Sequence, residues 1–542
     1  MKNCRLPFKS CVSVPYAFKK AWILQLLLFM AFVYSNTLCL ATSGVITQDT
    51  TWSLANSPYN ITGNILVDCG VTLLIEPGVV VKFQAGTYLK VEGKIFARGT
   101  WVNPITLESS SDNPISGDWS GIRIRSTGGT LMDGKQNYVS GSELKYVKIR
   151  HADRGLYVND TGLLVSYCEF SDNTNAIELR NTSGVKVANS TFIRNTTGLF
   201  SVYSDYTGDA VGSIVDTWIQ DNAFDDHFTA ISFNMNQRDF KNLNITGNLI
   251  KDGTNGIIFG GGGYGPRVHS VYIRNNTIFN NEGTGLSLAK VYGEATGTIE
   301  NYPIQIENNL IIDNGSCLAI SHGKIKSKIK ANVLKSTTGS AISVSGRSYN
   351  QLFDGNSIIT DGRLVHISGS RSYHPSRLEF TRNTFTRNSV SSTTVADLLY
   401  GGGYSFNLNN FQTPDGLILS VNTANDLNAK NNYWGTTTSE QIKFRVHDYY
   451  DDFEMGKIDY TPFLNSPFKD APISQPKNVT TQDISGGLKI SWDANPENDL
   501  VGYRVHFGSP TGYSYANAVN VGNLTSYTLA GANINDSIAV TA

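Results

Sequence analysis

One corner position recurs through the middle of this chain at intervals of 22 to 33 residues, with a single longer gap of 49 at the end. Each occurrence begins or adjoins a short strand signal. The recurring residues are Cys168, Ser190, Thr217, Asn248, Asn276, Asn309, Asn332, Asn356, Asn383 and Asn432. Such a period, lengthened irregularly by insertions, is typical of a solenoid whose coils consist of short strands joined by corners. We therefore expect an asparagine ladder, in which stacked amides satisfy backbone groups that the bend would leave unpaired.

A second column of residues follows these corners. After each one comes a turn containing glycine, and then a pair of apolar residues separated by one position. The pairs are Ile177/Leu179, Ile231/Phe233, Ile257/Phe259, Leu286/Leu288, Leu318/Ile320, Ile342/Val344 and Val365/Ile367. A period of two indicates strands. If each coil places its strand at the same point, the strands run parallel and their inward residues form one continuous core.

Several phrases in this pattern resemble those of secreted bacterial right-handed parallel β-helix proteins. They are NNTIF and NNLII in the middle, LLIEPGVVVKFQAGTYLKVEGKIFARGT and DWSGIRI near the start, and NNYWG at the end. The resemblance covers roughly residues 60 to 465 and implies an all-β, right-handed parallel β-helix. It implies no single activity, because this fold carries lyases, hydrolases, adhesins and inert stalks.

The first 41 residues differ in character from the rest. Basic residues precede an apolar run from Ala21 to Tyr34, and Cys39-Leu40-Ala41 places small residues where a signal peptidase cleaves. The pattern predicts a signal peptide over 1–41, a secreted or cell-surface protein, and no membrane span after cleavage. Cleavage would leave Cys69, Cys168 and Cys317, an odd number with spacing that suits neither a disulfide framework nor a zinc site. We therefore expect neither a metal nor a cofactor.

The remaining chain divides by its strand and turn pattern. We predict an N-terminal cap and first coils over 42–107, with 44–65 as the cover, and the β-helix with its terminal coil over 108–465. The stretch 466–475 reads as a linker. Separate alternating strands over 476–542 favour a small β-sandwich.

The last segment resembles a fibronectin type III module in the phrase GLKISWDANPENDLVGYRVHFG. The resemblance implies core positions for Trp492 and Tyr503. The chain ends inside what would be the sixth strand, so the last strand is missing. Either the sequence is truncated, or another segment supplies the strand.

Charge excludes one class of partner. The formal net charge is −1, from 44 basic and 45 acidic residues, which provides no overall field to recruit nucleic acid. Asp448, Asp451 and Asp452 form an acidic loop after the terminal coil, but their spacing matches no known calcium loop, and a solvated cap is the preferred interpretation. The sequence sets no oligomeric state.

The outward positions of the strands that carry these apolar pairs offer no obvious catalytic group. The first column is Glu178, Phe200, Ser232, Ile258, Ser287, Ala319, Ser343 and His366. Most of these side chains are small, hydroxyl-bearing or apolar. Glycoside hydrolysis requires convergent carboxylates, and calcium-assisted elimination requires an acidic ligand cluster beside a base. We find neither pattern in this column.

The loops after these strands carry aromatic and basic residues coil after coil. The candidate ligand-binding residues are Tyr264, Arg267, Lys290, Tyr292, Lys324, Arg347, Tyr349, Arg371 and Tyr373. If the coils stack in register, these residues form a ridge along one edge. Tyrosine rings stack on sugar rings, and Arg and Lys pair with uronate or sulfate groups. The alternative is that these long side chains only cover loop backbone.

The sequence thus favours an exported, non-catalytic protein that binds a polysaccharide or cell-surface glycan, or acts as an adhesin. The competing class is an extracellular polysaccharide lyase or glycoside hydrolase of the β-helix type, with Lys324, Lys326 or Arg347 as its base. The third hypothesis is that the protein is a purely structural stalk.

Overall fold

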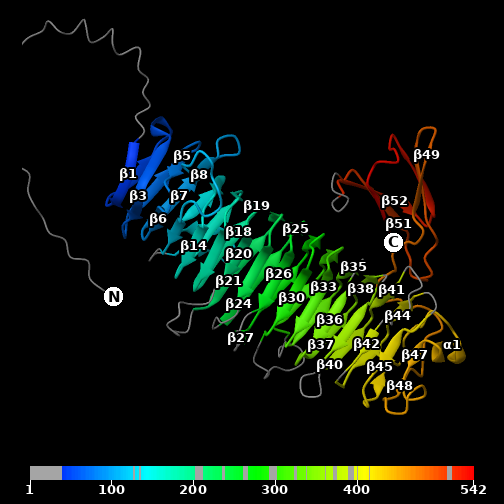
Figure 1. Ribbon diagram of the computed structural model, residues 1–542. Coiled ribbons are helices and arrows are strands. Elements are labelled where there is room, and N and C mark those ends of the chain that lie inside the picture. The colour runs from blue at the N-terminus through cyan, green and yellow to red at the C-terminus, as the bar shows by residue number, and fades with distance from the viewer. Residues whose placement is uncertain are drawn as a thin grey trace, which may run out of the picture.

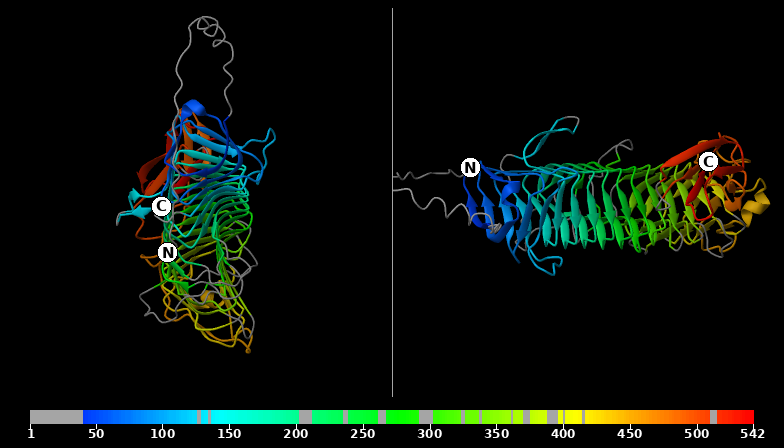
Figure 2. Two further views of the ribbon diagram at one scale, coloured as in Figure 1. Left: turned by 90° about the vertical axis from the view of Figure 1, so that its left-hand side faces the viewer. Right: turned by 90° about the horizontal axis from the view of Figure 1, so that it is seen from above.

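The protein forms an elongated rod of stacked coils, with a short helix and a separate β module at its C-terminal end (Figure 1). The computed structural model describes residues 40–125, 129–133, 136–201, 212–234, 239–260, 267–291, 302–322, 326–336, 339–360, 362–369, 375–387, 396–399, 401–413, 416–509 and 515–542. Seen from above, the coils lie side by side along the rod axis (Figure 2).

Each full coil contributes three strands in chain order, and each strand pairs in parallel with its equivalent in the next coil. The first-strand stack is β2 (Thr50–Trp52), β4 (Thr72–Ile75), β7 (Lys94–Arg98), β12 (Glu143–Lys145), β15 (Leu163–Ser166), β18 (Thr182–Ala188), β21 (Ile214–Gln220), β24 (Asp239–Thr246), β27 (Arg267–Val268), β28 (Val271–Arg274), β31 (Ile304–Glu307), β34 (Ser327–Lys330), β37 (Tyr349–Asp354), β40 (Ser376–Thr381), β43 (Ser405–Asn407), β46 (Leu427–Asn428) and β48 (Ile458–Asp459).

The second-strand stack begins with the first half of β1 (Leu40–Ile46), followed by the first half of β3 (Tyr59–Val67). It continues through β5 (Val80–Phe83), β8 (Ile105–Ser109), β13 (Val147–Arg150), β16 (Glu169–Ser171), β19 (Thr191–Ile193), β22 (Ala223–Asp225), β25 (Leu249–Lys251), β29 (Thr277–Phe279), β32 (Leu310–Ile312), β35 (Val333–Ser336), β38 (Ser357–Thr360), β41 (Thr384–Thr386) and β44 (Asn410–Gln412).

The third-strand stack begins with the second half of β1, followed by the second half of β3. It continues through β6 (Tyr88–Val91), β9 (Gly121–Ile124), β14 (Arg154–Asn159), β17 (Asn175–Arg180), β20 (Thr197–Ser201), β23 (Thr229–Asn234), β26 (Asn255–Gly260), β30 (Thr284–Ala289), β33 (Ser316–Ser321), β36 (Ile342–Ser345), β39 (Val365–Ser368), β42 (Ala396–Leu398), β45 (Leu419–Val421) and β47 (Val446–His447). The hairpin β10 (Leu131–Met132) and β11 (Tyr138–Ser140) projects between coils.

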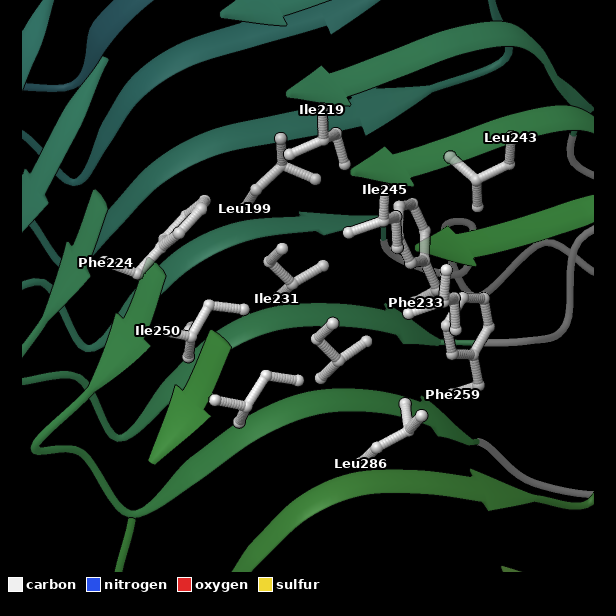
Figure 3. Close-up of a cluster of buried hydrophobic side chains, with 14 of the residues drawn as sticks. Leu199, Ile219, Phe224, Ile231, Phe233, Leu243, Ile245, Ile250, Phe259 and Leu286 are labelled. Atoms are coloured by element: carbon white, nitrogen blue, oxygen red, sulfur yellow. The ribbon is translucent and has the colours of Figure 1, made fainter. Parts of the chain in front are cut away.

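The predicted parallel solenoid is confirmed by the strand register. Ile231, Ile257, Leu286 and Leu318 pair in sequence along the third-strand stack, and all are fully buried. Figure 3 shows Leu199, Ile231 and Leu286 pointing into the interior with Phe224 and Ile250 of the second-strand stack. Because each coil buries its apolar side chains against both neighbours, every inward Leu, Ile or Phe contributes about 1.5–3 kcal/mol.

Aromatic rings extend this stacking in two places. Phe170, Phe192 and Phe224 follow one another with ring centroids 5.0 and 4.4 Å apart. The rings of Phe353, Phe380 and Phe406 stack at 4.5 Å in both steps. Offset parallel rings at such distances are favourable beyond the area they bury, so the core is ordered along the rod as well as across it.

An asparagine ladder occupies the corner between the first and second strands. The backbone N–H and the Nδ2 of each asparagine donate to Oδ1 of the next, for example from Asn276 to Asn309 at 3.0 and 2.9 Å. The Nδ2 of Asn309 also donates to the carbonyl of Ile273. The same bonds join Asn248, Asn276, Asn309, Asn332, Asn356, Asn383, Asn409 and Asn432.

The ladder corrects the sequence reading at two coils. Asn222, not Thr217, occupies the corner, because Thr217 faces inward from β21 and is fully buried. The gap between Asn383 and Asn432 contains a complete coil whose corner is Asn409. At the N-terminal end, Cys168 and Ser190 continue the column through the bond from the Cys168 N–H to Ser190 Oγ.

A second, shorter ladder lies at the corner between the second and third strands. Asn173 donates to Asn195 at 2.9 Å, and Asn281 donates to Asn314 at 2.8 Å. His227 takes the same place, with its ring nitrogens 2.8 and 3.1 Å from the carbonyls of Asn195 and Phe192. Burial lowers the pKa of His227, which favours the neutral form of its ring. The contacts of the ring with the two carbonyls give His227 a structural role at this corner.

The N-terminal end differs from the predicted arrangement. Residues 44–65 were expected to cover the stack, but β1 (Leu40–Ile46) and β3 pair in parallel with each other, and β3 pairs onward with β5 and β6. These residues therefore form the first coil itself. The predicted cleavage point after Ala41 falls within β1, and export remains a prediction.

The C-terminal end of the rod is closed by aromatic packing. Trp434 is fully buried, with its ring 5.0 Å from Phe411 and 6.2 Å from Tyr460. The helix α1 (Ser439–Lys443) follows it. In the acidic loop, Asp448 is buried and accepts backbone N–H groups from Tyr450 and Ile458. This carboxylate therefore holds the loop together.

The C-terminal residues form two three-stranded antiparallel sheets around a core of their own. The strands are β49 (Thr480–Ile484), β50 (Gly487–Ser491) and β53 (Ser526–Ala530), and β52 (Asn517–Gly522), β51 (Tyr503–Phe507) and β54 (Ile538–Thr541). Trp492 and Tyr503 are buried there, with rings 5.4 Å apart. The fibronectin type III likeness stays a prediction.

The stretch predicted as a linker packs against the rod. Thr384 Oγ1 donates to the Pro472 carbonyl at 2.5 Å, and Asn410 exchanges hydrogen bonds with the backbone of Phe468. Glu497 of the module is buried and accepts from Gln412 and from the Ser474 N–H. The module is therefore held against the last coils by directed contacts.

We predict that replacing Asn309 by Ala lowers the free energy of unfolding by about 3 kcal/mol, because it leaves the buried N–H of Asn276 without a partner and removes the Nδ2 bonds to the Ile273 carbonyl and to Asn332. The neighbouring Asn308 is exposed and has φ of 57°. Asn308→Gly should therefore change stability by less than about 1 kcal/mol. Urea unfolding of both variants tests the ladder, and equal effects would contradict it.

Candidate functional site

The outward face of the third-strand stack changes character along the rod. The expected column is confirmed by the register, in which Glu178, Phe200, Ser232 and Ile258 are paired neighbours. From Ser232 to Ser343 the outward side chains of this column are small or aliphatic and half-buried. This stretch is therefore a smooth and uncharged surface.

Charged residues gather at the N-terminal end of that face. Arg123 and Tyr157 precede Glu178 in the same column. Glu178 is 95% buried, and its Oε2 lies 3.1 Å from Nε of Arg154. Arg180 Nη1 donates to the Tyr157 hydroxyl at 3.4 Å. We call Glu178 and these flanking residues the Glu178 cluster.

The environment of the Glu178 carboxyl gives it a raised pKa. Burial raises the pKa of Glu178, and Asp153 raises it further, while Arg154 and Arg180 lower it. Within the described part of the chain its Oε2 accepts no hydrogen bond, despite the ion pair with Arg154. A buried carboxyl that keeps its proton more readily than usual can serve as a proton donor.

Sequence reasoning missed this cluster because it listed the outward column only from Glu178 onward. The two preceding coils supply Arg123, Tyr157 and Arg154. Their strands, β9 and β14, precede β17 in the same stack: β9 pairs with β14, and β14 pairs with β17, although an insertion separates β9 from β14 in the chain. The alternation Ile122/Ile124 and Leu156/Val158 was a usable signal that these strands belong to the same stack.

The predicted ridge is described only in part. Tyr264, Tyr292, Lys324, Arg371 and Tyr373 lie outside the described residues, and so does the side chain of Arg267. Lys290 is exposed after β30. Arg347, between β36 and β37, and Tyr349, the first residue of β37, are half-buried. These loops lead from the third strands into the first strands, so the ridge borders the start of the first-strand stack.

A pocket of about 320 Å³ lies at this border, and we call it the edge pocket. Its lining comes from the first residues of five coils: Tyr302, Lys326, Asn350, Gln351, Leu352, Arg377, Glu379, Gly403 and Ser405. Register explains their proximity, because Leu352, Glu379 and Ser405 are paired neighbours on successive strands. The structure thus brings the predicted alternative base Lys326 beside residues that the sequence reasoning did not single out.

A local backbone bend creates this hollow. Asn350, Arg377 and Gly403 occupy the same place on successive coils, with φ of 56°, 54° and 71°. The left-handed conformation suits glycine and asparagine but strains arginine. Arg377 is exposed in this position. Its backbone conformation, which arginine rarely adopts, places its side chain at the pocket.

The edge pocket contains charged side chains of both signs. Lys326 and Arg377 provide two positive charges against the carboxylate of Glu379. Burial raises the pKa of the Tyr302 hydroxyl, and the charges of Glu379 and Asp354 raise it further. The phenol therefore remains protonated and can both donate and accept hydrogen bonds.

The two buried cysteines are not suited to be reactive thiols. Cys168 and Cys317 are buried, and burial raises the pKa of Cys168 to about 12 and that of Cys317 further still. Thiols in such surroundings are poor nucleophiles. In the described ranges, no three His, Cys, Asp or Glu side chains are arranged to hold a metal ion.

Comparison with known families places the architecture. A model described as a pectate-lyase-like β-helix domain matches residues 44–155, and one described as a right-handed β-helix region matches 108–271 and 219–358. These matches agree with the strand register in giving the chain a parallel β-helix architecture. None of the helices in the part of this β-helix protein that the structure describes has the length and apolar character that a membrane span requires.

Solved structures similar to this β-helix protein include two that act on or bind sugars by their titles. One is a tailspike protein mutant of E. coli bacteriophage HK620 in complex with a pentasaccharide, at 13% identity and TM-score 0.37, covering 88% of this chain and 85% of that one. Another is the A-module of the Azotobacter vinelandii mannuronan C-5 epimerase AlgE6, at 14% identity and TM-score 0.31, covering 76% and 88%. No curated protein sequence matches significantly.

We predict that the Glu178 cluster makes stability depend on pH. Because the pKa of Glu178 is raised in the folded state, the native protein binds more protons than the unfolded chain above the usual glutamate range, and stability falls as pH rises through that window. Glu178→Gln should remove this part of the dependence.

Urea unfolding of wild type and Glu178→Gln between about pH 4 and pH 8 checks this expectation. The variant should gain stability relative to wild type as pH rises. Glu440→Gln, at an exposed site in α1, is the control for loss of a carboxylate elsewhere. A wild-type advantage that grows with pH would contradict the assignment.

Proposed function

We propose that this protein binds an extended, acidic polysaccharide at the edge pocket and along the adjoining ridge, without cleaving it. The observation that carries the proposal is the convergence of Tyr302, Lys326 and Arg377 on one hollow of about 320 Å³. The volume is at the lower end of the range for small-molecule sites and suits a short stretch of a sugar chain.

The lining residues supply the contacts that a uronate-containing or sulfated chain needs. Arg377 can bind a carboxylate or sulfate through two parallel N–H groups, and Lys326 adds a second cation. Tyr302 offers an aromatic face and a protonated hydroxyl. Glu379, Asn350 and Gln351 can accept or donate hydrogen bonds to sugar hydroxyls.

The rod geometry favours a long ligand. Equivalent residues of successive coils are about 4.8 Å apart, so loops on neighbouring coils contact neighbouring parts of one chain. Lys290, Arg347 and Tyr349 follow the third strands along the same edge. Several weak contacts in a row give an affinity that no single contact provides.

Export and surface display complete the proposal. The N-terminal segment has the pattern of a signal peptide, and the C-terminal module is suited to act as a spacer or attachment for the rod. An exported rod that holds a glycan along its side is an adhesin or a polysaccharide-binding protein of the cell surface.

Arg377→Gly tests the binding site without endangering the fold. Glycine is favoured at φ of 54°, so the variant should fold with equal or greater stability while losing the guanidinium. We expect retardation by alginate, polygalacturonate or dextran sulfate in affinity electrophoresis to weaken at least about tenfold, the loss of one charged hydrogen-bonding group. Tyr302→Ala should act in the same direction.

Two surface variants serve as controls for these changes. Lys443→Ala and Tyr450→Ala remove an exposed cation and an exposed ring at the C-terminal cap. Both should bind as wild type does. Unchanged binding by Arg377→Gly and Tyr302→Ala would contradict the assignment of the edge pocket, as would the absence of binding to all three acidic polymers.

A second candidate function rests on the Glu178 cluster. A carboxyl with a raised pKa beside Arg154, Tyr157 and Arg180 has the elements of a proton donor and an anion-stabilising group. This favours a polysaccharide lyase or hydrolase acting on the third-strand face. Such an activity would release reducing ends or unsaturated products, and Glu178→Gln should abolish it while Arg377→Gly leaves turnover at saturating substrate intact.

A further inference from the structure

A second pocket lies far from the edge pocket, at the corner between the first and second strands near the N-terminal end. Its volume is about 560 Å³. We call it the corner pocket. The residues that matter for its chemistry are Trp101, Tyr146, Lys148, Tyr167 and Glu169. They come from successive coils and line a mainly aromatic hollow that opens to solvent.

Two tyrosines form one wall of the corner pocket in an unexpected backbone conformation. Tyr146 and Tyr167 have φ of 51° and 55°. Most other coils place small or amide side chains at this same turn, including Asn189, Asp221, Gly247, Asn275, Asn308, Ala331 and Gly355. The turn itself therefore does not call for an aromatic ring, and bulky residues are disfavoured in this region. The two rings stack with centroids 5.0 Å apart at 21°.

The preceding coil adds a third aromatic residue at the same corner. The N–H of Gly99 donates to the Lys145 carbonyl, as the turn residues do in later coils, and a short insertion after Gly99 carries Trp101. Trp101 is 85% exposed. An indole left in water sacrifices the free energy that burial would provide, and exposed apolar groups beside a hollow mark binding sites.

The polar part of the pocket is a compact ion pair. Glu169 accepts from Arg150 at 2.5 Å and lies 3.1 Å from Lys148. Although partial burial raises it, the hydrogen bonds from Arg150 and Lys148 leave the pKa of Glu169 below its usual value. Glu169 is thus a fixed acceptor beside a donor. Lys148 and Glu169 are the charged residues of the pocket lining, and they pair with each other. Arg150 pairs with the same carboxylate from outside the lining, and Lys145 lies over both tyrosine rings.

We propose that the corner pocket binds uncharged sugar units of a glycan, as a site distinct from the edge pocket. Sugar rings present C–H faces that pack on tyrosine and tryptophan, while vicinal hydroxyls bind a carboxylate and an ammonium group held side by side. The aromatic wall favours the C–H face of a sugar, and the carboxylate and ammonium of the lining already pair with each other, so neutral hydroxyls are the groups that they bind. The lining of the edge pocket, with two cations to one carboxylate, favours a uronate.

The two pockets are well separated. The corner pocket borders β12 and β15, and the edge pocket borders β34, β37 and β40. Six coil steps separate β15 from β34, which at about 4.8 Å each gives roughly 30 Å along the rod. Loss of one site therefore leaves the other intact, and the two proposals can fail independently.

Affinity electrophoresis in gels containing mixed-linkage β-glucan, galactomannan or xylan tests the corner pocket. Tyr167→Asn installs the residue that the turn has at Asn189 and should fold as well as wild type. We expect wild type to be retarded by at least one neutral polymer, and Tyr167→Asn and Trp101→Ser each to weaken that retardation at least tenfold. Added salt should have little effect, because the contacts are stacking and neutral hydrogen bonds.

The control variant makes the same change at an unrelated corner. Leu408 has φ of 59° at the equivalent turn near the other end of the rod, and Leu408→Asn should bind neutral glycans as wild type does. Arg377→Gly should also keep this binding. Retardation by no neutral polymer, or retardation unchanged in both Tyr167→Asn and Trp101→Ser, overturns the proposal.

Discussion

The hydrogen-bonded asparagine ladder is the constraint on which the rest of this structure depends. A coil that turns sharply leaves a backbone N–H and a carbonyl pointing into the interior, and an unpaired buried group of this kind is destabilising by about 1–3 kcal/mol. Each asparagine satisfies both groups and passes the same requirement to the next coil, as from Asn276 through Asn309 to Asn332. The bonds hold neighbouring coils in one register.

Register decides where function can arise. Inward positions are committed to the core, where Ile, Leu and Phe side chains stack along the rod. Outward positions and turns are free to vary. The features that stand out are local departures from the repeat: a carboxyl buried on an outward face at Glu178, an arginine in a left-handed turn at Arg377, and tyrosines in left-handed turns at Tyr146 and Tyr167. Each departs from what the fold alone requires.

The repeat was predictable from sequence because its causes are local and periodic. The corner asparagines and the alternating apolar pairs located the strands from β17 to β39 within a residue or two. Thr217 was assigned to the corner because an alternating strand also surrounds it, and only the pairing with Val185 and Leu243 shows that it faces inward. Asn409 was missed because the long gap concealed one coil.

The sites were harder to predict because they depend on contacts between coils. Glu178 stood in the outward column, but Arg154 and Tyr157 lie more than twenty residues earlier and meet it only through register. Tyr302 and Arg377 likewise belong to different coils that the edge pocket unites. Tyr146 and Tyr167 were not singled out, since sequence does not reveal a left-handed turn at a residue that seldom adopts one.

A crystal structure of the protein soaked with an acidic oligosaccharide, such as a short oligoguluronate, tests the central claim most directly. The account predicts sugar density between Tyr302 and Arg377, with a carboxylate paired to the guanidinium and the corner asparagines aligned beneath. Density confined to other surfaces, or coordinates that place Tyr302 and Arg377 apart, would contradict it.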